Sequence, residues 1–186
     1  MTHRTAAELE QGMEHVTAAP RDDGSVRLIV RRTGQGQREV LAVGELDREV
    51  GLVGDDWVNR PRRATGQPSP YAQVTVMNAR FAELIAGDAG PRTWAQAGDQ
   101  LYVDLDLSQE NLPPGSRLAV GAAIIEISAE PHTGCAQFSA RFGLDAMQLA
   151  NSERGRALRL RGANAMVVEP GLVRTGDLAR KLPTGP

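Results

Sequence analysis

Short apolar segments that alternate with polar residues, and that end at glycine or proline, constrain the fold of this chain most. Residues 26–30 and 101–107 alternate in this way, and residues 72–77, 117–120 and 122–127 are further short apolar runs. Alternation with a period of two is typical of strands. The 186 residues include 20 glycines and 11 prolines, while only 4% are aromatic. We therefore predict a mainly β chain that turns often and has an aliphatic core.

A few helical patterns interrupt the strands. Thr5 and Glu8 form a possible capping box before a helical stripe that ends at Pro20, and residues 79–86 and 143–151 are also helical in pattern. Residues 25–31 and 40–43 flank a glycine turn and predict a hairpin. The helices alternate too irregularly with the strands for a parallel sheet. We predict an α+β fold, a mixed β-barrel with helices over its ends. Residues 1–47 supply a helix and hairpin that are part of the barrel or appended to it, and residues 48–186 form the main domain.

Composition excludes several classes of function. Charge is nearly balanced, with 21 basic and 23 acidic residues and a formal net charge of -2. This argues against nucleic-acid binding by bulk electrostatics. No apolar run reaches the roughly 18 residues of a membrane span, and the first residues lack the apolar core of a signal peptide. One cysteine cannot form an intramolecular disulfide. We therefore expect a cytoplasmic protein that does not contact a membrane.

The single cysteine, Cys135, follows an unusual loop, Glu130–Gly134. If this thiol has a function, it is as a soft donor to sulfur or to a transition metal. The alternative is a small apolar residue buried in the core. His132, three residues earlier, is either a base or ligand partner for the thiol, or a residue that hydrogen-bonds its own loop.

Residues 154–164 contain four arginines and two glycines. If the segment is extended, Arg159 and Arg161 face the same side and can hold an anion such as phosphate. Gly162 would let the backbone approach the ligand, and Asn164 could contact the edge of a heterocycle. The alternative is a solvated basic strand edge.

Two further residues are candidates for the same site. Arg141, together with Arg159 and Arg161, could supply a positive field that favours the thiolate of Cys135. Asn111 could make a polar contact at the pocket, although the chemistry of a loop explains it as well.

Taken together, these segments resemble the MOSC domain, which is named from the C-terminal domain of molybdenum cofactor sulfurases. The resemblance covers roughly Arg48 to Ala179, and residues 125–164 are its most specific part. The layout is similar to stand-alone bacterial MOSC proteins, without an aminotransferase-like domain and its pyridoxal phosphate. The motifs, in order, are Gly54–Trp57, Gln73–Asn78, Asn111–Leu112, Leu118–Gly121, Pro131–Cys135, Arg141–Gly143, Arg159–Asn164, Gly171 and Gly176–Asp177.

The resemblance implies a barrel built around one functional cysteine, and Cys135 occupies that position. In the family the cysteine either binds molybdenum in the pterin cofactor or carries sulfur as a persulfide. The first role implies an oxidoreductase that acts on N-hydroxylated or related small molecules, with a redox partner. The second implies a sulfur carrier that receives sulfur from a cysteine desulfurase. Under the first role, Cys135 is the metal ligand and acts with His132, while Asn111, Arg141, Arg159, Arg161, Gly162 and Asn164 bind the cofactor.

Overall fold

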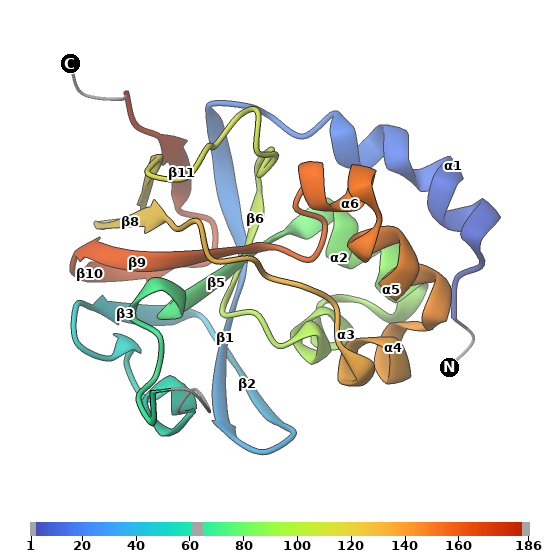
Figure 1. Cartoon of the computed structure of the whole chain (residues 1–186). Helices are drawn as coiled ribbons and strands as arrows, with labels where there is room; N and C mark the ends of the chain where they lie inside the picture. The colour runs from blue at the N-terminus through green and yellow to red at the C-terminus, as the bar shows by residue number, and fades with distance from the viewer. Residues whose placement is uncertain (1–2, 61–64, 184–186) are drawn as a thin grey trace.

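A closed barrel forms the centre of the computed structural model, which describes residues 3–60 and 65–183 (Figure 1). Within those residues the barrel has seven strands in the order β11-β7-β8-β9-β5-β6-β1, and pairing of β1 with β11 closes it. Only β5 and β6 run parallel, so the predicted mixed barrel is confirmed. The strands are β1 (Asp23–Gly34), β5 (Val74–Asn78), β6 (Leu101–Asp104), β7 (Arg117–Val120), β8 (Ala123–Ile127), β9 (Ala163–Glu169) and β11 (Leu178–Lys181).

The predicted hairpin is present, but its first strand is longer than predicted and its return strand begins and ends earlier in the chain. Strand β1 runs through to Gly34 and pairs with β2 (Gln37–Leu41), which is the outer strand of the same sheet. The predicted return strand, 40–43, divides at Ala42, because Val43 begins β3 (Val43–Asp47) of a second sheet. That sheet has the order β10-β3-β4, with β10 (Gly171–Arg174) and β4 (Gly51–Leu52). Since β1 pairs with β11 and β6 through residues 23–29, that part of the strand belongs to the barrel wall.

The strands separate two apolar cores. The barrel interior is filled by aliphatic side chains only, as the low aromatic content predicted. Most of the aromatic side chains, namely Phe81, Trp94, Tyr102, Phe138 and Phe142, lie in a second core between the outer barrel wall and the helices. Strand β6 shows the alternation directly, since Leu101 and Val103 point into the barrel while Tyr102 points to the helices.

The helices cover one side of the barrel, on the right in Figure 1. Helix α1 (Ala6–Thr17) begins at the predicted capping box, in which Thr5 and Glu8 bond reciprocally. Helix α2 (Ala79–Ala86) is capped by the side chain of Asn78 and ends at Gly87, as predicted. The remaining α-helices are α3 (Pro91–Trp94), α4 (Ala136–Phe142), α5 (Leu144–Asn151) and α6 (Glu153–Ala157), and the 3-10 turns are η1 (Asp56–Asn59), η2 (Pro70–Ala72), η3 (Gly87–Ala89) and η4 (Ala95–Ala97). None of the helices within the described ranges is long and apolar enough to cross a membrane.

Candidate functional site

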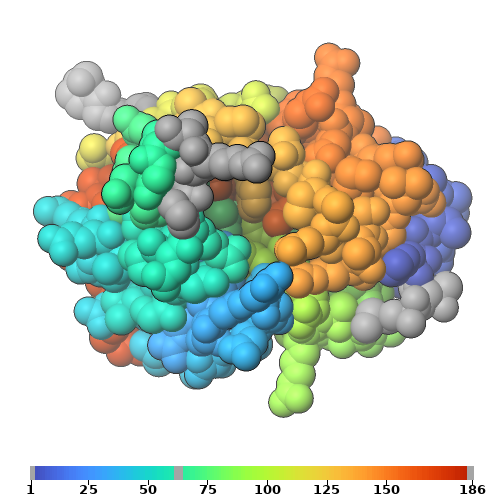
Figure 2. Space-filling model, turned by 60° about the horizontal axis from the view of Figure 1, so that its bottom comes forward, coloured from blue at the N-terminus to red at the C-terminus, as the bar shows by residue number. Residues whose placement is uncertain are grey.

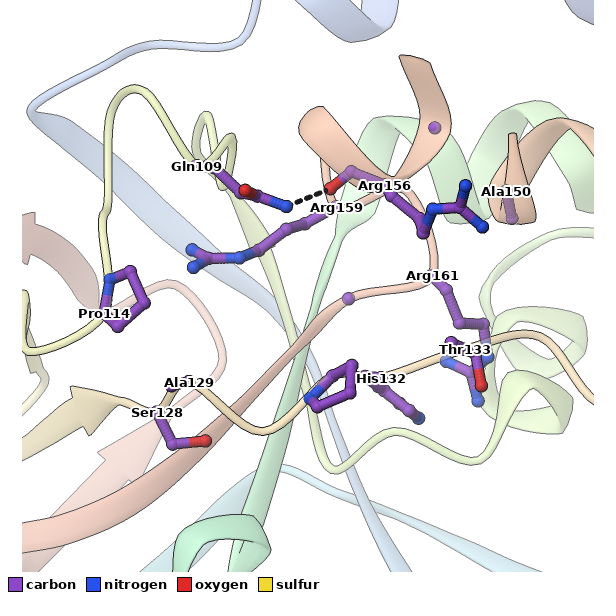
Figure 3. Close-up of a pocket in the computed structure, with 13 residues that line it drawn as sticks. Gln109, Pro114, Ser128, Ala129, His132, Thr133, Ala150, Arg156, Arg159 and Arg161 are labelled. Atoms are coloured by element: carbon purple, nitrogen blue, oxygen red, sulfur yellow. Dashed lines mark hydrogen bonds between the residues drawn. The ribbon is translucent and has the colours of Figure 1, made fainter. Parts of the chain in front are cut away.

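A pocket of about 160 Å³ lies at one end of the barrel, where three loops meet (Figure 3). The loop after β8 forms one wall, the turn after α6 forms another, and the segment 109–114 forms the third. The lining residues are Gln109, Pro114, Ser128, Ala129, Pro131, His132, Thr133, Ala150, Gly155, Arg156, Arg159, Arg161 and Gly162.

The pocket is strongly cationic. Among the residues that the structure describes, three arginines line it, and no aspartate or glutamate does. Arg156 is exposed, and Arg159 is half-buried with its guanidinium donating to the carbonyl oxygens of Leu107 and Leu112. Burial lowers the pKa of Arg159. Carbonyl oxygens bind a guanidinium without cancelling its charge, so the pocket keeps a net positive charge that favours an anionic ligand.

Arg159 and Arg161 do not lie on an extended strand, so the condition under which both would face the same side is not met. Residues 153–157 form helix α6, residues 158–161 form a turn, and β9 begins only at Ala163. The side chain of Ser152 caps α6 by accepting from the backbone of Gly155 at 2.9 Å, which starts a helix where alternation had indicated a strand. Arg159 then adopts a positive φ of 48°. Both arginines still line the pocket, but their side chains extend in different directions (Figure 3).

A buried charge cluster lies under the pocket. Arg161 donates to Asp99 Oδ2 at 2.6 Å and to the carbonyl oxygen of Ala97 at 2.9 Å, and its guanidinium lies 5.0 Å above the ring of Phe138. Asp99 is fully buried, and its Oδ1 faces Nδ1 of His132 at 3.4 Å. Asp99 is thus a site residue that sequence reasoning missed. Its one signal is an acidic residue two positions before an apolar strand, and that pattern is too common to indicate burial.

His132 is uncharged at neutral pH. Burial, together with the positive charges of Arg161 and Arg32, lowers its pKa to about 3, although Asp99 opposes this shift. Nδ1 is buried while 18% of the side chain remains exposed. A lone pair on Nδ1 would face a carboxylate oxygen, so the hydrogen of the neutral ring belongs on Nδ1. Nε2 then carries no hydrogen and can accept a hydrogen bond.

The loop that carries His132 is fixed from both sides. The side chain of Asn164 is buried and donates to the carbonyl oxygens of Glu130 at 3.1 Å and Pro131 at 3.3 Å. Asn151 binds Gly134 twice, accepting from its N–H at 2.8 Å and donating to its carbonyl oxygen at 3.0 Å. In this structure, therefore, the amide donors of Asn164 hold the loop in place.

A glycine is required at position 162, where the turn after α6 touches the loop that carries His132. Its φ is +107°, and a Cβ there would lie 2.6 Å from the carbonyl oxygen of Val76. The same Cβ would lie 3.2 Å from Asp99 Oδ1 and 3.4 Å from His132 Nδ1. Any larger residue at this position would push the carboxylate and the imidazole aside.

Cys135 is exposed, so it is not a buried apolar residue. It occupies the position before the first residue of α4, and its carbonyl oxygen accepts from the N–H of Ser139 at 3.0 Å. It is not one of the pocket-lining residues, although Thr133, two positions earlier, is. Cys135 thus lies two positions after a pocket-lining residue in the sequence and is exposed to solvent.

The structure does not bring the other two candidates to this pocket. Asn111 is buried and donates to the carbonyl oxygens of Arg21 and Asp106, while its own oxygen accepts from Lys181. Arg141 lies in the last turn of α4 and donates to the carbonyl oxygen of Gln96 at 2.5 Å. Neither residue lines the pocket. The predicted site residues therefore do not form one group: Asn111 is buried away from the pocket, and Arg141 lies in α4.

The fold is shared with several solved structures. The YuaD protein from Bacillus subtilis superposes with a TM-score of 0.66 and 16% sequence identity, covering 88% of this chain and 97% of that one. YiiM from Escherichia coli gives a TM-score of 0.55 and 17% identity over 87% of this chain and 71% of its own. YiiM from Geobacillus stearothermophilus gives 0.53 and 13% over 88% and 74%. No protein-family model and no curated protein sequence matches the chain. At these identities the likeness establishes the barrel fold alone.

Proposed function

We propose that this protein binds an anionic pterin cofactor, the molybdenum cofactor, in the arginine pocket and beside Cys135. The observation that carries the proposal is a pocket lined by three arginines and no carboxylate, next in the chain to an exposed thiol. The resemblance of the sequence to MOSC domains and the barrel shared with YuaD and YiiM also support it. The expected activity is reduction of an N-hydroxylated or related small molecule.

The donor set fits such a group. Arg156 and Arg159 have no carboxylate partner within the described residues and are available to a phosphate. Arg161 is already paired with Asp99, but its buried Nε has no hydrogen-bond partner. The thiolate of Cys135 is a soft ligand, of the type that suits a transition metal. When bound, the cofactor would supply two-electron redox chemistry at the metal.

The residues of this chain would bind and orient the ligand. Arg159 and Arg156 would neutralise its negative charge. Arg161 would support the pocket from beneath through its hydrogen bonds to Asp99 and Ala97. His132 would accept a hydrogen bond at Nε2 from an N–H or O–H group of the ligand, because its Nδ1 hydrogen faces Asp99. Asn164 and Gly162 would keep that imidazole in place.

Expression in a host that makes the molybdenum cofactor tests the proposal. We expect purified wild-type protein to contain molybdenum and pterin in near-equal amounts, about one per chain. Cys135→Ser should lose the metal, because a hydroxyl is a poor soft ligand. Arg159→Ala should lower the pterin content roughly tenfold, by loss of a charge-assisted contact.

Arg174→Ala is the matched control, since it removes an exposed arginine of β10 and should leave both contents unchanged. Absence of both molybdenum and pterin from wild-type protein of a cofactor-producing host would contradict the proposal. Added sulfur on Cys135 without metal, seen by mass spectrometry after incubation with a cysteine desulfurase, would assign the thiol to sulfur transfer instead.

A further inference from the structure

A second group of arginines lies next to helix α4, which begins directly after Cys135. Arg38 comes from the hairpin strand β2 and Arg141 from α4, and both strand and helix pack on η4. Arg141 donates to the carbonyl oxygen of Gln96 in η4 at 2.5 Å. Nη2 of Arg38 lies 3.3 Å from the place that a Cβ on Gly98 would take. Two guanidiniums that are 103 positions apart in the sequence (141 minus 38) therefore meet at one turn.

These two charges have no carboxylate partner within residues 3–60 and 65–183. Arg38 donates through Nη1 to the carbonyl oxygen of Gln37 at 2.6 Å, and its buried Nε has no hydrogen-bond partner. Burial and the positive charges of Arg141, Arg60 and Arg32 lower the pKa of Arg38. A half-buried donor that points at no acceptor and is surrounded by like charge is costly without a counter-ion.

The neighbouring cations differ from this pair because each has a carboxylate. Arg60 binds Asp56 through two hydrogen bonds at 2.8 and 3.0 Å, and Arg32 binds Asp55 in the same manner. Two carboxylates therefore balance two of the four guanidiniums. The excess of two positive charges matches a doubly charged anion.

Space for a ligand lies beside Arg38, and helix α4, which carries Arg141, contributes Gln137 to its lining. A cavity of about 270 Å³ is lined by Gln35, Gly36, Arg38, Asp56, Arg60 and Gln137, which belong to the hairpin, η1 and α4. Figure 2 shows the molecule hollowed between these three segments, with the hairpin in light blue, the segment of η1 in green-cyan and that of α4 in orange. Gln137 is two positions after Cys135, so the cavity adjoins the segment that carries the thiol.

We propose that Arg38 and Arg141 form a second anion site, separate from the arginine pocket, which binds the phosphate group of a phosphate monoester. Two planar guanidiniums can hold such a dianion by charge-assisted hydrogen bonds. The anion site itself is independent of the proposed cofactor. That the phosphate belongs to a substrate presented to Cys135 rests on the proposed function.

Titration with inorganic phosphate, methyl phosphate and acetate at constant ionic strength tests the site in cofactor-free protein. Nitrogen–proton NMR spectra of the arginine Nε–H groups report the contact, with the Arg38 signal assigned by Arg38→Lys. We expect saturable shifts of the Arg38 signal with both phosphates, and binding of acetate about tenfold weaker because it carries half the charge.

Acetate that binds as tightly as phosphate would overturn the dianion assignment. Binding of inorganic phosphate without methyl phosphate would overturn the monoester assignment.

Arg141→Ala should weaken phosphate binding about tenfold, through loss of one charge-assisted hydrogen bond. If that variant does not fold, Arg141→Gln removes the same charge with less loss of volume. Arg27→Ala is the matched control and removes an arginine of strand β1. Its partner Asp104 still binds Arg80 in the variant, so no carboxylate is left unpaired. Arg159→Ala should also leave the Arg38 response unchanged. Equal affinities in Arg141→Ala and Arg27→Ala, or an Arg38 signal that does not move, would overturn the proposal whether or not the protein binds molybdenum.

Discussion

Residues 3–60 and 65–183 contain two buried arginine–aspartate pairs that differ in how completely their hydrogen bonds are satisfied. Asp55 accepts from the backbone and guanidinium of Arg32, from the N–H of Trp57 and from the side chain of Gln100. Asp99 accepts from Arg161, but its second oxygen faces His132 at 3.4 Å without a hydrogen bond. Nδ1 of His132 and Nε of Arg161 also lack partners.

This difference follows the position of each pair. The Arg32–Asp55 pair joins β1 to the start of η1, and none of its buried side-chain nitrogen or oxygen atoms lacks a partner, which is typical of a pair that holds the fold together. The Arg161–Asp99 pair lies under the pocket, and its unsatisfied atoms belong to residues that line it or contact its lining. Buried polar groups without partners cost stability, so their presence beside a cationic pocket points to a ligand-binding role.

Truncating each aspartate should reveal the largest difference between the pairs. Asp55→Ala leaves Arg32 buried without its carboxylate and removes the cap of η1, and we expect a loss of about 3–5 kcal/mol in the free energy of unfolding. Asp99→Ala leaves Arg161 bound to Ala97 and stacked on Phe138, so a loss of about 1–3 kcal/mol is expected. Urea denaturation at neutral pH measures both values. A loss in Asp99→Ala equal to that in Asp55→Ala would remove the distinction between the two pairs.

The pH dependence of stability should further distinguish the Arg161–Asp99 pair, which faces His132, from the Arg32–Asp55 pair. The pKa of His132 is about 3 in the folded protein, against roughly 6.5 in an unfolded chain. Only the unfolded chain therefore takes up a proton as the pH falls below about 6.5. Wild-type protein should lose about 2 kcal/mol of stability from this one group by pH 5, and more as the pH approaches 3.

His132→Gln abolishes that titration and keeps a side chain of similar reach. We expect its free energy of unfolding, measured in urea, to fall less than that of the wild type between neutral pH and about pH 5, by the same 2 kcal/mol. His15→Gln removes an exposed histidine of α1 and serves as the control. If the wild type and His132→Gln lost stability in parallel, His132 would not be buried uncharged beside Asp99.

Local patterns in the sequence predicted most of the barrel, and the pocket shows where such patterns fail. Period-two alternation placed β1 and β6, short apolar runs placed β5, β7 and β8, and the capping box of Thr5 placed α1, because these signals act within a few residues. Alternation failed at Arg159 and Arg161, where the Ser152 cap and a left-handed residue turn the chain. Asp99 was missed because its role depends on partners that are 33 and 62 positions away in the sequence. Register between distant strands decides such contacts, and local sequence does not encode it.

The smallest expected change is also the most specific to the pocket pair, since it concerns one hydrogen atom. In Asp99→Asn the amide oxygen should stay on the guanidinium of Arg161, which offers only donors. The amide NH₂ must then face Nδ1 of His132, which becomes an acceptor, so the ring hydrogen moves to Nε2. Nitrogen NMR shifts of His132 should show hydrogen on Nδ1 in the wild type and on Nε2 in the variant, with little change in stability.

The same substitution at Asp55, which lies against Arg32 and not against an imidazole, should leave the His132 shifts as in the wild type. Because the two tautomers offer the pocket an acceptor and a donor respectively, ligands that donate to Nε2 should bind Asp99→Asn less tightly. An unchanged tautomer would mean that the carboxylate of Asp99 does not orient His132.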